Sequence, residues 1–181
     1  SDPETASKIV TNAKLRRTSI CGAAETILID EKCIDSHLPK IISDLKSGGC
    51  EIRGDKKCKE KFDEIILASD DDWKTEYLDA IISIRIVNGV EDAIDHIAKY
   101  GSGHTESIVS ESKDSVEKFL NSVDSAIVMH NTSTQFADGG EFGLGAEIGI
   151  ATGKLHARGP VGLEGLTTYK YIVRGSGQIR P

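Results

Sequence analysis

The run at residues 80–87 (AIISIRIV) constrains the fold more than any other part of the sequence. Its aliphatic residues fall on both faces of an extended strand, so both faces must be covered. In soluble proteins, strands of this kind occur mainly in parallel sheets that lie between two layers of helices. The run therefore favours an α/β fold with a mainly parallel sheet.

Shorter apolar runs alternate with amphipathic segments along the rest of the chain. Further strands are predicted at 27–29, 50–54, 106–109 and 125–129, and helices at 6–15, 36–45, 90–100 and 112–120. Strands separated by helices of about ten residues are typical of βαβ units. We therefore expect a three-layer α/β/α domain.

A glycine-rich stretch follows at residues 138–162, with eight glycines between Gly139 and Gly162. Residues 143–149 (GLGAEIG) are one residue away from the GxGxxG fingerprint of dinucleotide-binding folds. That fingerprint needs a strand leading directly into the turn, whereas an extended loop from Thr132 precedes these glycines. We expect a loop that permits tight backbone turns near a site rather than a phosphate cradle.

The last apolar segment, residues 167–173 (TTYKYIV), alternates polar and apolar positions like a half-exposed strand. Its mixture of polar and aromatic side chains suits an edge strand that pairs with another chain. The segment therefore predicts a contact between copies in a homo-oligomer.

Charge and cysteine content argue against several classes of protein. The 181 residues include 22 Lys and Arg against 29 Asp and Glu, a net charge of −7. This balance, without a dense basic block, argues against nucleic-acid binding. No apolar run approaches the ~20 residues that span a bilayer and no signal peptide opens the chain, so we expect no membrane contact and a cytoplasmic location. The four cysteines are then expected to be reduced thiols.

The sequence begins with Ser1, and its only methionine is Met129, deep in the chain. We interpret the chain as a piece of a longer protein. Features supplied by the remaining part are then invisible in this sequence.

Cys21 is the strongest candidate for a nucleophile. It follows Arg16 and Arg17, and it precedes Gly22, whose small size leaves room for a substrate beside the sulfur. Nearby cations favour the thiolate, which is the reactive form of cysteine. The alternative is a buried structural thiol, and the local sequence leaves both open.

Other polar residues carry weaker signals. The run Asp70-Asp71-Asp72 is interpreted as a solvated loop, and no metal site is expected. Surface or core positions, without a chemical role, are expected for the remaining cysteines and for the histidines: Cys33, Cys50, Cys58, His37, His96, His104, His130 and His156.

Four longer runs carry a resemblance to a known family. They are NAKLRRTSICGAAET (12–26), WKTEYLDAIISIRIV (73–87), HNTSTQFADGGEFGLGAEIGIAT (130–152) and KLHARGPVGLEGLTTYKY (154–171). These runs resemble the gamma-glutamyl phosphate reductase family of the aldehyde dehydrogenase superfamily. The resemblance implies the C-terminal portion of such an enzyme, with a catalytic domain at residues 1–166 and an oligomerisation strand at residues 167–181.

The resemblance also implies an activity and partners. The implied reaction is NADPH-dependent reduction of L-glutamyl 5-phosphate to L-glutamate 5-semialdehyde and phosphate in proline biosynthesis, through a cysteine thioester. NADPH would be bound mostly by an N-terminal part that the sequence lacks. A second copy of the chain and glutamate 5-kinase are the implied protein partners. A hydrolytic aldehyde dehydrogenase and a noncatalytic oligomerisation or binding module stay open as alternatives.

The resemblance assigns Cys21 as the nucleophile and Glu76 as a ligand of the nicotinamide ribose. Glu76 stands where the superfamily has an E-x-F-G-P motif, from which Leu78 and residues 79–80 depart. The asparagine that stabilises the oxyanion, and the glutamate that activates water in hydrolytic members, would lie in the missing part.

The hydroxyl-rich loop at residues 132–136 provides candidates for binding the zwitterionic end of the substrate. Ser133 and Thr134 are the expected contacts, with Phe136 beside the aliphatic part and Arg158 as a partner for the carboxylate. Two alternatives stay open: the hydroxyls satisfy only the loop backbone, or Arg158 serves a subunit interface.

Overall fold

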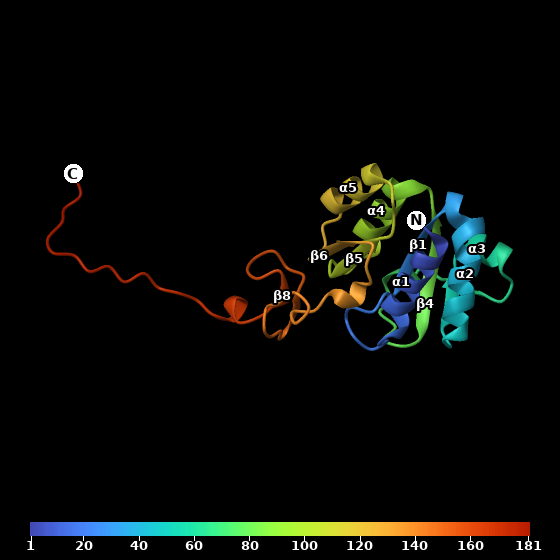
Figure 1. Cartoon of the computed structure of the whole chain (residues 1–181), viewed down its shortest axis with the longest axis horizontal. Helices are drawn as coiled ribbons and strands as arrows, with labels where there is room; N and C mark the ends of the chain where they lie inside the picture. Colours follow the sequence, from blue (N-terminus) through green and yellow to red (C-terminus); the bar gives the residue numbers. More distant parts are fainter.

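The computed structural model describes all residues from Ser1 to Pro181. It consists of an α/β body at residues 1–137 and a C-terminal arm at residues 138–181 that extends away from the body (Figure 1). The helices are α1 (Pro3–Leu15), α2 (Ile34–Ser47), α3 (Lys56–Lys61), α4 (Gly89–Tyr100) and α5 (Lys113–Ser122). The strands are β1 (Thr26–Asp30), β2 (Glu51–Gly54), β3 (Ile66–Leu67), β4 (Ile81–Val87), β5 (Thr105–Ile108), β6 (Ile127–His130), β7 (Gly149–Ala151) and β8 (Gly159–Val161).

The strands form three sheets. The largest has the order β1-β4-β2-β3 with every neighbouring pair parallel, and β5 and β6 form a separate parallel pair. β7 and β8 are an antiparallel pair in the arm. Helices α2 and α3 lie on one side of the largest sheet and α4 on the other, which gives the expected three layers (Figure 1). None of the helices has the length and apolarity that a membrane crossing requires.

The central strand β4 forms the middle of the core, as its continuous apolar run predicts. Ile82 and Ile84 are fully buried. They belong to a cluster of 13 buried residues to which α2 contributes Leu38, Ile41 and Leu45. The helical spacing of these α2 residues places them on one face, which packs against the sheet.

Local signals explain where the first helix begins and where α2 ends. The Asp2 carboxylate accepts a hydrogen bond from the Thr5 backbone N–H at 2.8 Å, and Pro3 occupies the first helical position. At the end of α2, the Gly48 N–H donates to the Asp44 carbonyl at 3.1 Å, and Gly49 follows with φ of +78°. The predicted helices and the longer predicted strands are confirmed within a few residues.

Three features differ from the sequence prediction or were missing from it. The two-residue strand β3 and the hairpin β7–β8 were not predicted. Residues 167–173 are extended, but they have no strand partner within the chain.

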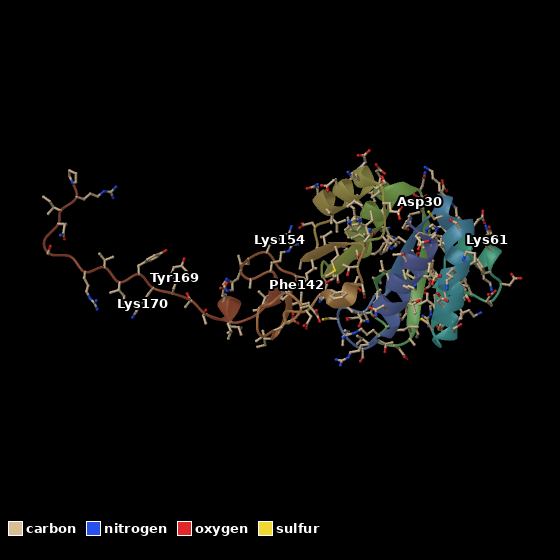
Figure 2. All side chains as sticks on the ribbon, in the orientation of Figure 1. Asp30, Lys61, Phe142, Lys154, Tyr169 and Lys170 are labelled. Carbon is tan, nitrogen blue, oxygen red and sulfur yellow. The ribbon has the colours of Figure 1, made fainter.

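The arm buries little of its apolar surface. Figure 2 shows Tyr169 and Lys170 on an extended segment far from the body. Large apolar side chains are exposed along the whole arm: Phe142, Leu144, Ile148, Leu155, Leu163, Leu166, Tyr169, Tyr171, Ile172, Val173 and Ile179.

Candidate active site

Cys21 lies on the loop that connects α1 to β1. Both ends of this loop are tied together, because the Ala24 N–H donates to the Ala13 carbonyl at 3.0 Å. Beside this bond, the fully buried Lys14 ammonium pairs with the Glu25 carboxylate at 2.6 Å. The loop is thus closed at its base, and Cys21 lies near its tip.

A second segment, more than a hundred residues further along the chain, fixes the loop from the side. The Gln135 Nε2 donates to the Ala13 carbonyl at 2.8 Å and to the Arg17 carbonyl at 3.1 Å. The Thr134 hydroxyl donates to the Gly22 carbonyl at 2.7 Å. A Cβ on Gly22 would lie 3.2 Å from the Thr134 carbonyl oxygen, so the absent side chain permits this close approach. The residues that follow β6 therefore hold the backbone of the cysteine loop in place.

A cavity of about 680 Å³ opens beside Cys21. Residues from four separate parts of the chain line the cavity near this end: Cys21, Gly22, Glu76, His104, Thr132 and Thr134. From there the cavity continues between β1 and β5. The fold therefore brings Cys21, Glu76 and Thr134, three of the predicted site residues, to one cavity.

The electrostatic surroundings of Cys21 differ from the prediction. Cys21 is exposed, yet partial burial of its thiol and the Glu147 carboxylate raise its pKa, with Glu76 adding to the effect. The expectation that Arg16 and Arg17 favour the thiolate is wrong for this structure. The Arg16 guanidinium instead donates to the Gln135 side-chain oxygen at 3.4 Å.

Glu76 is exposed on the segment that leads into β4, and a buried polar cluster supports this segment. The Tyr77 hydroxyl donates to Asp72 at 2.7 Å and lies 2.7 Å from the Ser83 hydroxyl. Arg53 pairs with the same Asp72 carboxylate at 2.8 Å. Burial alone would raise the pKa of Asp72, but the hydrogen bonds from Tyr77 and Arg53 hold it well below its usual range. The interpretation of Asp72 as part of a solvated loop is therefore wrong.

The remaining predicted residues lie away from the cavity lining. The buried Ser133 hydroxyl accepts from the Gln135 N–H at 3.3 Å, and half of the Phe136 side chain is exposed. Arg158 pairs with Asp124 at 2.9 Å. The hydroxyls of Ser133 and Thr134 thus make the backbone contacts that were the alternative to substrate binding.

Three residues of the site were not predicted from the sequence: Gln135, Glu147 and His104. Gln135 and Glu147 act on parts of the chain distant in sequence, so no local pattern marks them. His104 is held by a 2.7 Å contact between its Nδ1 and the Thr105 hydroxyl, while its Nε2 is buried without a partner. Burial lowers its pKa, against the raising effect of Glu76 and Glu147. A histidine beside a glycine-rich turn was the available signal, and it is too common to be specific.

The first part of the glycine-rich stretch, residues 138–148, has the loop character that the sequence predicts, whereas its second part contains the hairpin β7–β8. Gly143 and Gly145 have φ values of +73° and +74°, and added Cβ atoms there would meet nothing within 4 Å. The Glu147 carboxylate accepts from the Gly139 N–H at 2.7 Å and closes the turn. No group of three or more His, Cys, Asp or Glu side chains is placed to hold a metal ion.

Comparison with solved structures defines the class of protein. A propionaldehyde dehydrogenase from Clostridium phytofermentans superposes with a TM-score of 0.57 at 15% identity, over 76% of this chain and 40% of that one. The chain therefore has the fold of an aldehyde dehydrogenase catalytic domain, and Cys21 lies on a loop of that fold.

Closer relatives define the family. A crystal structure of gamma-glutamyl phosphate reductase from Thermotoga maritima matches with a TM-score of 0.96 and 48% identity, over all of this chain and 44% of that one. Proteins named gamma-glutamyl phosphate reductase from Parvibaculum lavamentivorans and Allorhizobium ampelinum are 62% and 59% identical over 99% of this chain. The chain belongs to the gamma-glutamyl phosphate reductase family and spans 42% of the length of these two relatives. No protein-family model matches the sequence.

Proposed function

We propose that the chain supplies the nucleophile of an enzyme that reduces L-glutamyl 5-phosphate to L-glutamate 5-semialdehyde and phosphate with NADPH. The observation that carries this proposal is the placement of Cys21 at the cavity, on a loop that Gln135 and Thr134 hold. Two relatives that are 62% and 59% identical and are named gamma-glutamyl phosphate reductase support it.

The chemistry needs a thiol that acts first as a nucleophile and then as a leaving group. The Cys21 thiolate attacks the acyl carbon, a C–S bond forms, and the phosphate leaves with the electron pair of the broken C–O bond. Backbone N–H groups, including that of Cys21, stabilise the negative oxygen of the tetrahedral species. A reduced nicotinamide would supply, when bound, the hydride that the thioester carbon needs. Cys21 would then act as the leaving group: the C–S bond breaks as the oxyanion re-forms the C=O bond, which releases the aldehyde and restores the thiolate.

Glu76 is the residue of this chain that we assign to the cofactor. Its carboxylate is exposed at the cavity that Cys21 lines, and a carboxylate can accept hydrogen bonds from two ribose hydroxyls. The glycine-rich stretch fits the cofactor poorly, because Glu147 closes its turn and no strand leads into it. We therefore assign most of the NADPH contacts to the part of the enzyme outside these residues.

For the glutamyl group, we propose contacts with Ser133 and Thr134, with Phe136 beside the aliphatic carbons. Thr134 is the best placed, because it lines the cavity and its hydroxyl can still accept a hydrogen bond. Arg158 is the proposed partner of the carboxylate, and it would have to leave Asp124 to serve this role.

The arm and its partners complete the proposal. We assign residues 167–181 to pairing with a second copy of the chain, since their apolar side chains are exposed and no strand of this chain pairs with them. Glutamate 5-kinase, whose product would be the acyl phosphate, is the proposed enzyme partner.

The test uses the full-length polypeptide in the reverse direction, with glutamate semialdehyde, phosphate and NADP as reactants. We expect NADPH formation that depends on phosphate, and a loss of at least roughly 1,000-fold in turnover for Cys21→Ser, since a serine hydroxyl is far less nucleophilic than a thiolate. Cys33→Ser is the matched control and should retain activity, because Cys33 lies beyond β1 from the catalytic loop. NADPH formation without phosphate would indicate the hydrolytic reaction instead, and substantial activity of Cys21→Ser would exclude Cys21 as the nucleophile.

A further inference from the structure

A buried ion pair lies between the cysteine loop and the segment that carries Glu76. The Lys14 side chain is fully buried and its Nζ lies 2.6 Å from Oε2 of Glu25, whose side chain is 18% exposed. Glu25 follows Cys21 on the same loop. The Lys14 Nζ also lies 5.9 Å from the centroid of the ring of Tyr77, the residue next to Glu76. The pair therefore connects the two segments on which the assigned nucleophile and the assigned cofactor ligand lie.

Tyr77 is joined to the cysteine loop by a second route, through Ser83 of β4. The fully buried Ser83 donates its N–H to the Glu25 carbonyl at 2.9 Å, and its hydroxyl lies 2.7 Å from that of Tyr77. The Arg53 guanidinium lies 5.1 Å from the centroid of the Tyr77 ring, a distance at which a cation and an aromatic ring attract each other. Tyr77 is thus fixed relative to Glu25 through both its hydroxyl and its ring.

One oxygen of Glu25 is left over by these contacts. Oε1 is buried and lacks a hydrogen bond of full geometry, which is costly for a carboxylate. Burial raises the pKa of Glu25, while Lys14 and the backbone N–H groups of Leu78 and Tyr77 act in the opposite direction. These two N–H groups therefore lie close enough to act on the carboxylate without completing a bond to Oε1. Contacts of this kind often shorten when an enzyme binds its ligands.

The backbone at Leu78 has a conformation that needs support. Its φ of +54° lies in the left-handed region, which residues other than glycine rarely adopt. Such a conformation costs free energy and persists only where the surroundings hold it. About half of the Leu78 side chain is exposed, so packing of this side chain provides little of that support. The backbone contacts of the segment, including those with Glu25, remain to hold the turn.

We propose that Glu25 is a positioning residue. Its carboxylate, held by Lys14, accepts from the backbone N–H groups of residues 77 and 78 and thereby fixes Glu76 relative to the cysteine loop. This role rests on the proposed function, in which Glu76 binds the cofactor ribose. The nucleophile and the hydride donor must meet at one carbon atom, so a small displacement of the cofactor lowers the rate. Glu25 itself acts on the reaction only through Glu76.

The first test compares two neutral replacements of the ion pair in the full-length polypeptide. Lys14→Met/Glu25→Gln keeps an acceptor oxygen, whereas Lys14→Met/Glu25→Met removes it, and both variants lose the buried charges together. We expect the second variant to raise the KM for NADP roughly tenfold relative to the first, with the KM for phosphate unchanged. Lys57→Met/Glu31→Gln removes an exposed pair as the matched control and should leave both constants unchanged. Equal KM values for NADP in the two Lys14 variants would overturn the proposal.

A double-mutant cycle with Glu76→Ala tests whether Glu25 acts through Glu76. We expect Glu76→Ala alone to raise the KM for NADP, and addition of Lys14→Met/Glu25→Met to raise it no further than about twofold. Effects that multiply would overturn the positioning role and leave the assignment of Glu76 to the cofactor intact. An unchanged KM for NADP in Glu76→Ala would instead overturn that assignment, and the positioning role with it. The two failures are therefore distinguishable.

Hydrogen exchange in the unmodified full-length protein decides the matter even where the substituted proteins fail to fold. The amides of Tyr77 and Leu78 should exchange at least roughly tenfold more slowly than that of Asp79, after correction for intrinsic rates. Asp79 is the internal control, because it is exposed in the same segment and its N–H donates no backbone hydrogen bond. Equal protection of the three amides would mean that Glu25 accepts from neither N–H group and would overturn the proposal.

Discussion

The α/β body and the C-terminal arm both contain many apolar side chains, but they use them differently. In the body, strand β4 and helix α2 bury theirs in one cluster of 13 residues. In the arm, Leu155, Val173 and Ile179 are at least 90% exposed. A fully buried aliphatic side chain stabilises a fold by roughly 1.5–3 kcal/mol, and these arm residues contribute nothing of the kind within this chain.

This difference shows that packing within the chain stabilises the conformation of the body but not that of the arm. The body has layers that cover one another, apart from the cavity that residues of β1 and β5 line. The arm has a single short hairpin and an extended segment that has no strand partner within this chain. The arm is therefore the region of this chain that leaves the most apolar surface uncovered.

The largest contrast between the two regions is expected for stability. Ile84→Ala removes a fully buried side chain from the centre of β4 and should lower the free energy of unfolding by about 2–5 kcal/mol. Tyr171→Ala, in the arm, should leave unfolding of the dilute protein unchanged and only weaken association between copies. Urea unfolding at several protein concentrations measures both. A loss of similar size for Tyr171→Ala at high dilution would mean that the arm packs on its own body.

Ion pairs provide a second, somewhat smaller contrast. Lys14 is fully buried, so Lys14→Met leaves the Glu25 carboxylate without its partner at the base of the cysteine loop. Removing one partner of a buried pair costs about 3–5 kcal/mol, and the partial exposure of Glu25 places the expected loss near the lower end. Lys154→Met is the matched control, because it breaks the exposed pair of Lys154 with Asp124 and should leave the unfolding midpoint unchanged. Equal midpoints for the two variants would contradict this assignment.

The sequence predicted the body better than the arm for a physical reason. The periodicity of α2 and the apolar run of β4 are local patterns that packing then confirms. The hairpin β7–β8 has three-residue strands in which Gly149, Gly159 and Pro160 disfavour strand structure, and one β-branched residue in each strand is too little to indicate it.

Within the site, what the sequence missed depends on distant contacts. Gln135 holds carbonyls 118 and 122 positions earlier, and nothing around it in the sequence indicates this role. The side-chain oxygen of Gln135 also accepts a hydrogen bond from the Arg16 guanidinium, which was expected to act on Cys21 instead. In the run of three aspartates, the contacts with Arg53 and Tyr77 distinguish buried Asp72 from its neighbours.

The smallest expected effect concerns the one place where the arm acts on the chemistry of the body. Glu147 belongs to the arm, and its negative charge contributes to the raised pKa of Cys21. Glu147→Gln removes that charge while keeping an acceptor for the Gly139 N–H, so the turn should persist. The pKa of Cys21 should fall, the thiolate fraction at neutral pH should rise, and alkylation by iodoacetamide should accelerate. A pKa shift of up to one unit gives an acceleration of up to about tenfold.

The pH dependence gives this last prediction its sign. Below the pKa of Cys21, the variant has more thiolate than the parent and reacts faster at every pH. Far above that pKa both thiols are ionised, so the two rates should converge. Glu141→Gln is the matched control, because it removes the same charge from the arm at an exposed position, whereas Glu147 is the carboxylate that contributes most to the raised pKa of Cys21. Mass mapping after limited labelling measures the rate at Cys21 separately from the other three thiols. Equal alkylation rates for Glu147→Gln and Glu141→Gln would show that the charge of Glu147 does not raise the pKa of Cys21. The arm would then have no electrostatic effect on the nucleophile of the body.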